Sequence, residues 1–327
     1  MPDDTARYYD TNTSRFLRFG RGSSDGAIHR AIWSPGTRRL EQAVHYTDRL
    51  VLGDLHDALG DRQGHGGDGD GVDGARSADS TPVVVDLGCG VGGSIAFLER
   101  RCPGVYIGIT NSSVQRDIAA SRARKRGSAA AFRLDDMDDP TLYRERLPRC
   151  GVDLLMMIES FVHAAAPRVV LGGAARVLRP GGRLVICDDT LGHGPGLARN
   201  CGGAAGGGEA DPPRSRRRTR SCEHLLDRFR AGWHVRTLIA LEELASAAAA
   251  SGLTLLRTED LTSHVEMQRP RDRIIHALVP VIRLLGLRGA FWENLNGGDA
   301  LQTALRSGLV RYRYMVFEAA SSRPSRT

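Results

Sequence analysis

The stretch Val85-Asp86-Leu87-Gly88-Cys89-Gly90-Val91-Gly92-Gly93-Ser94 decides how this chain should fold. The apolar run at 82–87 is typical of a strand that is buried on both faces of a sheet. The glycines behind it allow a tight turn and let a ligand lie against bare backbone at the start of the following helix. This order of strand, glycine loop and helix predicts a ligand-binding turn at the carboxyl end of a sheet strand.

The rest of the chain repeats the alternation of strand and helix. Short apolar runs predict further strands at 105–109, 152–158, 183–187, 253–256 and 312–318. Helical patterns at 113–126, 168–178 and 238–251 lie between them. We therefore expect an α/β fold with a doubly wound, parallel sheet.

The glycine loop has two interpretations. A dinucleotide-binding fingerprint would need an acidic residue at the end of the second strand, where a ribose is held. That strand ends in Ile109-Thr110, whereas Asp86 stands just before the glycines. A carboxylate in that place repels a pyrophosphate and suits a cationic ligand, such as the sulfonium and ammonium groups of S-adenosylmethionine.

Four motifs in sequence order resemble the class I S-adenosylmethionine-dependent methyltransferases. The loop matches their D-x-G-x-G-x-G motif, and residues 108–115 are similar to the G-[IV]-T-x-S-x-x-Q stretch of sterol and terpenoid C-methyltransferases. Residues 136–137 match the position that contacts adenine, and residues 158–164 resemble the I-E-[AS]-x-x-H-A segment. The resemblance implies a seven-stranded Rossmann-like sheet and cofactor contacts from Asp86, Gly88, Cys89, Gly90, Gly92, Thr110, Asn111, Ser112, Gln115, Asp136 and Met137.

Composition shifts divide the chain. We expect an N-terminal helical cap at 1–60, a flexible Gly/Asp/Ser-rich linker at 61–80, a methyltransferase domain at 81–320 and a tail at 321–327. Within the domain, the Gly-rich and Arg-rich stretch 192–221 predicts a disordered loop, and 262–308 predicts inserted lid helices.

Two polar residues are the candidate catalytic groups. Glu159 ends an apolar strand and His163 follows four residues later, which places both near the ligand edge of the sheet. Methylation of an alkene carbon creates a carbocation, which needs a π-face and a base. The candidate substrate contacts, each of which also has a purely structural interpretation, are Tyr9, His29, Arg30, Trp33, Phe161, Trp233 and Tyr312.

Three functions follow from these residues. The first is carbon methylation of an isoprenoid, either a prenyl diphosphate or a prenylated natural product, with Glu159 as the base. The second is methylation of an oxygen or nitrogen of a secondary metabolite, with His163 as the base. The third is a protein that binds S-adenosylmethionine or nucleic acid without catalysis, and the intact loop from Asp86 to Gly92 argues against it.

The composition of the 327 residues narrows the partners. The net charge of +7 comes almost entirely from arginine, which indicates a coding bias more than a phosphate-tracking surface, so we expect no nucleic acid. The six scattered cysteines argue against a zinc site and a disulfide framework and favour a reducing cytoplasm. We expect no metal, unless a diphosphate substrate brings Mg²⁺, and no membrane insertion. A homo-oligomer stays open.

Overall fold

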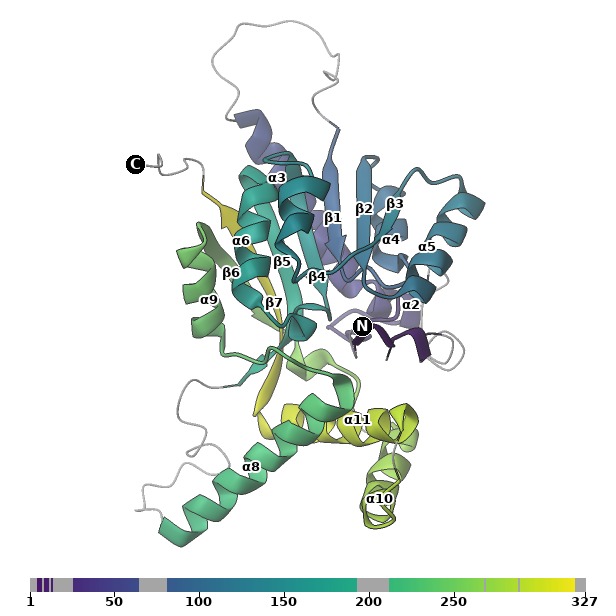
Figure 1. Cartoon of the computed structure of the whole chain (residues 1–327), viewed down its shortest axis with the longest axis vertical. Helices are drawn as coiled ribbons and strands as arrows, with labels where there is room; N and C mark the ends of the chain where they lie inside the picture. The colour runs from purple at the N-terminus through teal and green to yellow at the C-terminus, as the bar shows by residue number, and fades with distance from the viewer. Residues whose placement is uncertain are drawn as a thin grey trace, which may run out of the picture.

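The computed structural model describes residues 5–7, 9–11, 13, 26–64, 81–192, 212–267, 269–287 and 289–320 (Figure 1). Their centre is a seven-stranded sheet with the order β3-β2-β1-β4-β5-β7-β6. Its strands are β1 (Val83–Leu87), β2 (Val105–Thr110), β3 (Ala131–Leu134), β4 (Val152–Ile158), β5 (Leu178–Leu191), β6 (Leu253–Asp260) and β7 (Val310–Ala319). The seven-stranded α/β sheet expected from the motifs is confirmed.

One strand runs against the others. β1 to β5 pair in parallel, whereas β7 lies antiparallel between β5 and β6. The expectation of an entirely parallel sheet is therefore wrong at β7, because an alternation pattern gives the order of elements and not their direction. In the register, Asp86 on β1 stands beside Gly108 on β2 and Met156 on β4.

Helices cover both faces of the sheet (Figure 1). α3 (Tyr46–Gly64) and α4 (Gly93–Glu99) share one apolar core with side chains such as Val84, and α6 (Pro167–Val177) and α9 (Leu241–Ala250) share the other with side chains such as Val85. Alternate strand residues thus serve opposite cores, which is why these strands read as continuous apolar runs. Two further helices complete this part: α2 (Leu40–Val44) and α5 (Ser113–Arg126).

The N-terminal segment is more than a cap. α3 packs on the sheet through Val51 and Leu55, which are fully buried. Between them Asp54 accepts hydrogen bonds from Arg183 on β5 (3.3 Å) and Tyr314 on β7 (2.6 Å). α3 also continues through Gly64, so the linker expected from residue 61 does not begin before residue 65. Residues 65–80 and 321–327, expected as linker and tail, lie outside the described residues.

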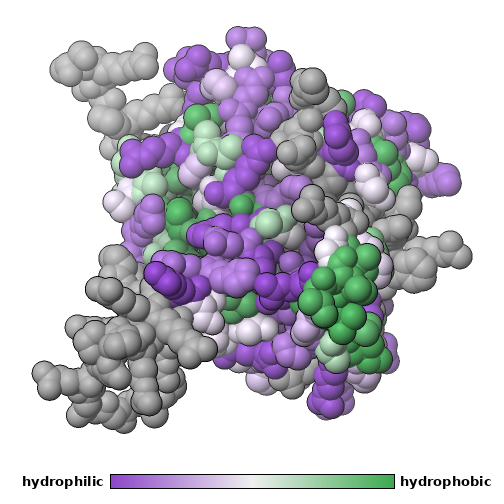
Figure 2. Space-filling model, turned by 60° about the horizontal axis from the view of Figure 1, so that its bottom comes forward, coloured by the Kyte–Doolittle hydropathy of each residue, from purple (hydrophilic) through white to green (hydrophobic). Residues whose placement is uncertain are grey.

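A second group of helices lies at the carboxyl edge of the sheet, below it in Figure 1. It consists of α8 (Pro212–Trp233), α10 (Pro270–Leu284) and α11 (Ala290–Ser307). Helices were expected at 262–308, and α10 and α11 lie there. Residues 212–221 were expected as a disordered loop, but they form the first half of α8. A Cβ at Gly232 would lie 2.5 Å from the Cα of Gly297, so glycines let α8 and α11 approach closely. Figure 2 turns this end forward and shows one compact green patch at its lower right.

Two sequence expectations meet simple tests. No helix among the described residues is both long and apolar enough to cross a membrane. Cys89, Cys102, Cys150 and Cys187 are free thiols. Cys222 on α8 is disulfide-bonded.

Candidate active site

The glycine loop is held open by backbone geometry. Gly88 has a φ of +86°, in the left-handed region that side chains rarely adopt. The amides of Gly88 and Cys89 both donate to the carbonyl oxygen of Ile109, at 2.8 and 2.9 Å, which ties the loop to the end of β2. A Cβ at residue 88 would lie 2.3 Å from the Cβ of Ser160. Only glycine therefore fits between β1 and the turn after β4.

A cavity of about 360 Å³ opens above this loop. Asp86 lines it, although the residue is only 3% exposed. Burial and the nearby Asp48 raise the pKa of Asp86 to about 8, and His29 offsets this only in part. A carboxylate held in this way favours a cationic ligand in the cavity, because a positive charge would restore its ionised form. The bare glycine backbone and this carboxylate fit S-adenosylmethionine.

The polar residues after β2 divide into two roles. Thr110, Asn111 and Gln115 line the cavity, and the Thr110 hydroxyl donates to Oε1 of Gln115 at 3.0 Å. Ser112 does not line it. Its hydroxyl instead accepts from the Gln115 amide at the start of α5 and donates to Asp10. Ser112 was expected as a cofactor contact, and the structure places it as a helix cap, since a serine before a helix satisfies a free amide there.

The far wall of the cavity comes from the segment after β3. Asp136 and Met137 both line it, as the resemblance implied. Sequence reasoning missed Asp138, whose carboxylate accepts from the amides of Ala165 and Ala166, each at 2.8 Å. This contact joins the wall to the start of α6. Gly92, another expected contact, does not line the cavity, because it is the N-cap of α4 and faces Phe132.

Glu159 sits at the mouth of the cavity on a strained backbone. Its φ is +54°, which is rare for a residue with a side chain and is found in sites where the surroundings hold a conformation in place. Its Oε1 accepts from the backbone amide of Arg30 at 2.7 Å and from the Tyr312 hydroxyl at 2.9 Å. The carboxylate is therefore already engaged on one oxygen.

Arg30 is occupied as well. Its guanidinium donates twice to the carboxylate of Asp189, at 2.7 Å each, and both side chains are largely buried. The guanidinium also lies 4.5 Å from the ring centre of Tyr312 and 5.9 Å from that of Trp233. Arg30 was expected to bind substrate. It lines the larger of the two spaces at this site, while its fork is paired with Asp189 and lies over the ring of Tyr312.

His163 has the geometry of a neutral base. Its Nδ1 lies 3.2 Å from the carbonyl oxygen of His234, and a carbonyl can only accept, so Nδ1 carries the proton. Nε2 then has a lone pair, which faces the Tyr9 hydroxyl at 2.8 Å. Burial lowers the pKa of His163 to about 4. The imidazole is thus uncharged near neutral pH, with its acceptor nitrogen at the cavity that His163 and Tyr9 line.

His29 carries the opposite charge state. Burial acts to lower its pKa, but the carboxylates of Asp48 and Glu159 outweigh this and raise the pKa to about 9. Its Nε2 lies 3.4 Å from Oδ1 of Asp48. The other carboxylate oxygen of Asp48, Oδ2, lies 2.6 Å from Nδ1 of His45. His29, which was expected as a substrate contact, lines the same cavity as the glycine loop.

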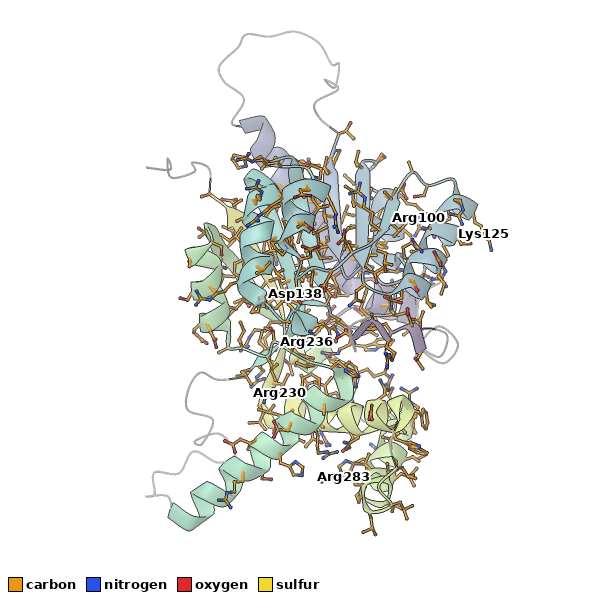
Figure 3. All side chains as sticks on the ribbon, in the orientation of Figure 1. Arg100, Lys125, Asp138, Arg230, Arg236 and Arg283 are labelled. Atoms are coloured by element: carbon orange, nitrogen blue, oxygen red, sulfur yellow. The ribbon has the colours of Figure 1, made fainter. Side chains whose placement is uncertain are left out.

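A larger chamber of about 980 Å³ adjoins this cavity. Its walls come from α10, α11 and the segment 265–267. Trp233, Arg269, Arg271 and Asn294 line both spaces. Figure 3 shows the band of side chains between the sheet and the lower helices, with Asp138 and Arg236 labelled in it. Trp233, which was expected as a substrate contact, therefore lies where the two spaces meet.

Three other expected substrate residues line neither space. Trp33 donates its backbone amide to the carbonyl of His264 and packs outside both. Phe161 is buried in the core beneath α6, and Tyr312 is fully buried and donates its hydroxyl to Glu159. Their position in accessory segments or near motifs was a weak signal, because an aromatic there packs as readily as it binds.

The described residues hold no cluster of three or more His, Cys, Asp or Glu side chains that could bind a metal ion.

The comparisons with known proteins agree with this geometry. Residues 85–186 match the family described as "Methyltransferase domain". Methyltransferase GfsG from Streptomyces halstedii is 37% identical over 106 residues, which cover 32% of this chain and 37% of that protein. The 27-O-demethylrifamycin SV methyltransferase from Amycolatopsis mediterranei is 26% identical over 72% of this chain and 70% of its own length. The chain thus spans well under half of the relative with the higher identity.

Solved structures extend the likeness to nearly the whole chain. The geranyl diphosphate C-methyltransferase from Streptomyces coelicolor A3(2) superposes with a TM-score of 0.57 over 97% of each chain, at 19% identity. At that identity the likeness concerns the fold. Residues 85–186 thus match a methyltransferase domain, and nearly the whole chain shares the fold of this solved methyltransferase.

Proposed function

We propose that this chain, built around a methyltransferase domain, transfers a methyl group from S-adenosylmethionine to a hydroxyl oxygen of a bulky small molecule, with His163 as the base. The observation that carries the proposal is the imidazole itself. Its Nδ1 proton is fixed on the His234 carbonyl, and its neutral Nε2 faces the cavity at the height of Tyr9. A neutral base with a fixed tautomer, whose lone pair points toward the cavity and accepts from the Tyr9 hydroxyl, is suited to the deprotonation of an alcohol or phenol.

S-adenosylmethionine, when bound, supplies an electrophilic methyl group on a sulfonium centre. The chain's own residues do the rest. The glycine loop and Asp86 would hold the cofactor's main chain and positive charge, and Asp136 and Met137 would lie beside its base. The Tyr9 hydroxyl donates to Nε2 of His163. An acceptor hydroxyl would either displace Tyr9 from Nε2 or pass its proton to Nε2 through the Tyr9 hydroxyl. Orientation of the two reactants supplies much of the acceleration.

The size of the substrate follows from the chamber. A volume of about 980 Å³ lies at the upper end of the usual range for small-molecule sites, so it suits a large acceptor. One relative is named for 27-O-demethylrifamycin SV, whose name describes an oxygen that lacks its methyl group. That name supports an oxygen acceptor for this chain without identifying the compound.

Carbon methylation of an isoprenoid is the second candidate. It is favoured by Glu159, whose carboxylate lies at the cavity mouth and could remove a proton from a cationic intermediate. Two contacts count against it. Arg30 lies over Tyr312 and Trp233, and a guanidinium there opposes a second positive charge. Oε1 of Glu159 also already accepts two hydrogen bonds, so that oxygen is not available to a substrate proton.

The test uses the full chain with S-adenosylmethionine carrying a ¹³C-labelled methyl group. The acceptor panel contains hydroxylated macrolactones, phenols, prenyl alcohols and geranyl diphosphate, and nuclear magnetic resonance identifies whether the label is bonded to oxygen or carbon. We expect a methyl ether. Replacing His163→Ala should lower kcat by about 10²–10⁴-fold, because general-base catalysis contributes that much. Glu159→Gln, which keeps the side-chain size, should lower it by less.

Two readouts decide between the candidates. Affinity for S-adenosylhomocysteine should change little in either variant, which separates loss of the base from loss of the cofactor site. Since the pKa of His163 is lowered to about 4, the basic form is present across the neutral range, and kcat of the unaltered protein should fall only as the pH drops toward that value. A label on carbon, with the loss confined to Glu159→Gln, would replace the first candidate with the second.

A further inference from the structure

The wall of the larger chamber carries more arginine than its own carboxylates neutralise. Arg30 donates to Asp189 at 2.7 Å. Arg269 donates to Asp272 at 2.9 Å. Among the described residues, the other arginines of the wall, called the chamber arginines below, are Arg271, Arg273 and Arg306.

The chamber arginines have little internal pairing to lose. Arg273 and Arg306 are exposed, and neither side chain forms a hydrogen bond or ion pair with another described residue. Arg271 is 62% exposed and comes no closer than 3.9 Å to the carboxylate of Asp272, which Arg269 already holds. A guanidinium in this state can bind an external anion without first releasing an internal one.

The acidic residues of the chamber do not neutralise the chamber arginines, because each of them acts on another cation. Asp299 pairs with Arg228 at 2.7 Å. Asp272 pairs with Arg269, and Glu266 also helps to raise the pKa of Arg269. The groups that remain for a ligand are therefore positive, and a cavity wall of one charge attracts ligands of the opposite charge.

The chamber arginines come from the part of the molecule where α10 and α11 meet. Asp272 stands between Arg271 and Arg273 in α10, and its carboxylate accepts a hydrogen bond from the Gln302 side chain of α11. Arg306 follows Gln302 by four residues, which is one turn along the same face of α11. An anionic group at this end of the chamber would therefore be within reach of arginines from both helices.

Much of the remaining wall is apolar. Leu295, Leu301 and Leu305 line the chamber from α11, and Ile275 lines it from α10. Burial of apolar surface stabilises a bound molecule in proportion to the area removed from water. The ligand that suits both parts of the wall has an apolar body and one anionic group.

We propose that the methyl acceptor is an amphiphilic acid, whose carboxylate or phosphate is bound in the chamber by Arg273 and Arg306. This rests on the proposed function, since it names the class of molecule whose hydroxyl would be methylated. Arg273 and Arg306 line only the chamber, whereas Arg271 lines the cofactor cavity as well. The anionic end therefore lies in the chamber, with Arg271 on its cofactor side. Guanidinium groups bind carboxylates and phosphates through the same forked geometry.

The experiment is calorimetric titration of the full chain, saturated with S-adenosylhomocysteine so that the cofactor cavity is filled. The probes have similar apolar bodies: 1-naphthoate, 1-naphthyl phosphate and the neutral 1-naphthamide. We expect at least one anion to bind about tenfold more tightly than the amide, and this advantage to shrink at high salt because exposed charges are screened. The anion that binds more tightly identifies the group as carboxylate or phosphate.

A pair of double variants locates the site. In Arg273→Gln/Arg306→Gln the advantage of the anion should fall below about threefold. Arg230→Gln/Arg283→Gln is the matched control, because it removes the same charge from α8 and α10 at residues that line neither space and that Figure 3 labels. The control should keep the full advantage. None of these four side chains is buried, so circular dichroism should show the unaltered fold.

Several outcomes overturn the proposal. Absence of binding by both anions does so, as does binding of the amide as tight as that of the anions. An advantage that Arg273→Gln/Arg306→Gln keeps, or that the control also loses, contradicts the assignment of the site.

Methyl transfer separates this proposal from the proposed function. If an acidic acceptor and its methyl ester give labelled methyl ethers with equal kcat/KM, the anion site is wrong and the oxygen methylation stands. If the anions bind through Arg273 and Arg306 but no acceptor gains a methyl group on oxygen, the anion site stands and the oxygen methylation is wrong.

Discussion

The cofactor cavity and the chamber adjoin each other, yet they are built from different kinds of structure. The cavity lies at the ends of β1, β2 and β4, where hydrogen-bonded strands fix each wall. The chamber lies among α8, α10 and α11, which meet the sheet only at one edge and carry exposed leucines on the outside. A cofactor site needs fixed positions for its contacts, and the sheet provides them. A substrate site can differ in shape between proteins of one fold, and here helices outside the sheet form it.

Each region is also tied by one buried carboxylate. Asp54 joins α3 to β5, β6 and β7 through Arg183, Arg257 and Tyr314. Asp299 on α11 joins α8 and α10 through Arg228 (2.7 Å) and His276 (2.5 Å). Asp54 is completely buried, whereas the His276 partner of Asp299 is 62% exposed. The tie in the sheet should therefore matter more.

The largest effect is expected at Asp54. Replacing Asp54→Ala leaves the Tyr314 hydroxyl and Arg183 without a buried acceptor, and breaking a buried ion pair costs about 3–5 kcal/mol. Urea unfolding should show a loss of that size in the free energy of unfolding. The matched control is Asp57→Ala, which removes a carboxylate 3.2 Å from the same Arg183 but 67% exposed, and it should cost less than about 1 kcal/mol. Similar losses in both variants would contradict the comparison.

The second effect concerns the glycine loop. Gly88→Ala places a Cβ against Ser160 and strains a left-handed backbone, which costs about 1–3 kcal/mol. Calorimetric affinity for S-adenosylhomocysteine should fall by about tenfold to a hundredfold. Gly172→Ala is the control, since a Cβ there meets nothing within 4 Å and alanine favours the helical state of α6. Unchanged affinity in Gly88→Ala would remove this loop from the cofactor site.

The smallest effect is expected at Asp299. Asp299→Ala should lower the free energy of unfolding by only about 1–2 kcal/mol, because hydrogen bonds to charged groups contribute about that much and one partner is exposed. Affinity for S-adenosylhomocysteine should stay the same, since Asp299 lines only the chamber. The exposed neighbour Asp227→Ala, which removes a pair with Arg230, serves as control. A tenfold loss of cofactor affinity in Asp299→Ala would show that the two regions are not separable.

The cofactor side was largely predictable because its signals are local. Asp86 and the glycines that follow occupy one short stretch, and Glu159 and His163 lie four residues apart at the end of a strand. The glycines indicate a turn with left-handed backbone, and the apolar run before Glu159 indicates a buried strand. Ser112 and Gly92, expected from the same motifs, do not line the cavity, because a motif gives a position along the chain and not what that residue faces.

The substrate side was not predictable in the same way. The pair of Arg30 and Asp189 joins residues 159 positions apart, and no local pattern announces it. α8 was missed because its Arg-rich composition resembles a solvated loop. A signal existed nonetheless: Cys222, Leu226 and Phe229 recur at helical spacing, and all three are buried. The spacing of these apolar residues indicates the helix, whereas the composition of the segment does not.

The course of the N-terminal segment has a consequence for what counts as an autonomous unit. Residues 26–29 line the cofactor cavity, and α3 covers β4 and β5, yet both precede the stretch 85–186 that matches the methyltransferase domain. A fragment that began at residue 81 would keep the whole glycine loop. It would also expose one apolar face of the sheet to water and leave the cofactor with an open wall. Minimal expression fragments, fusions and transplanted domains should therefore carry both parts of this chain together.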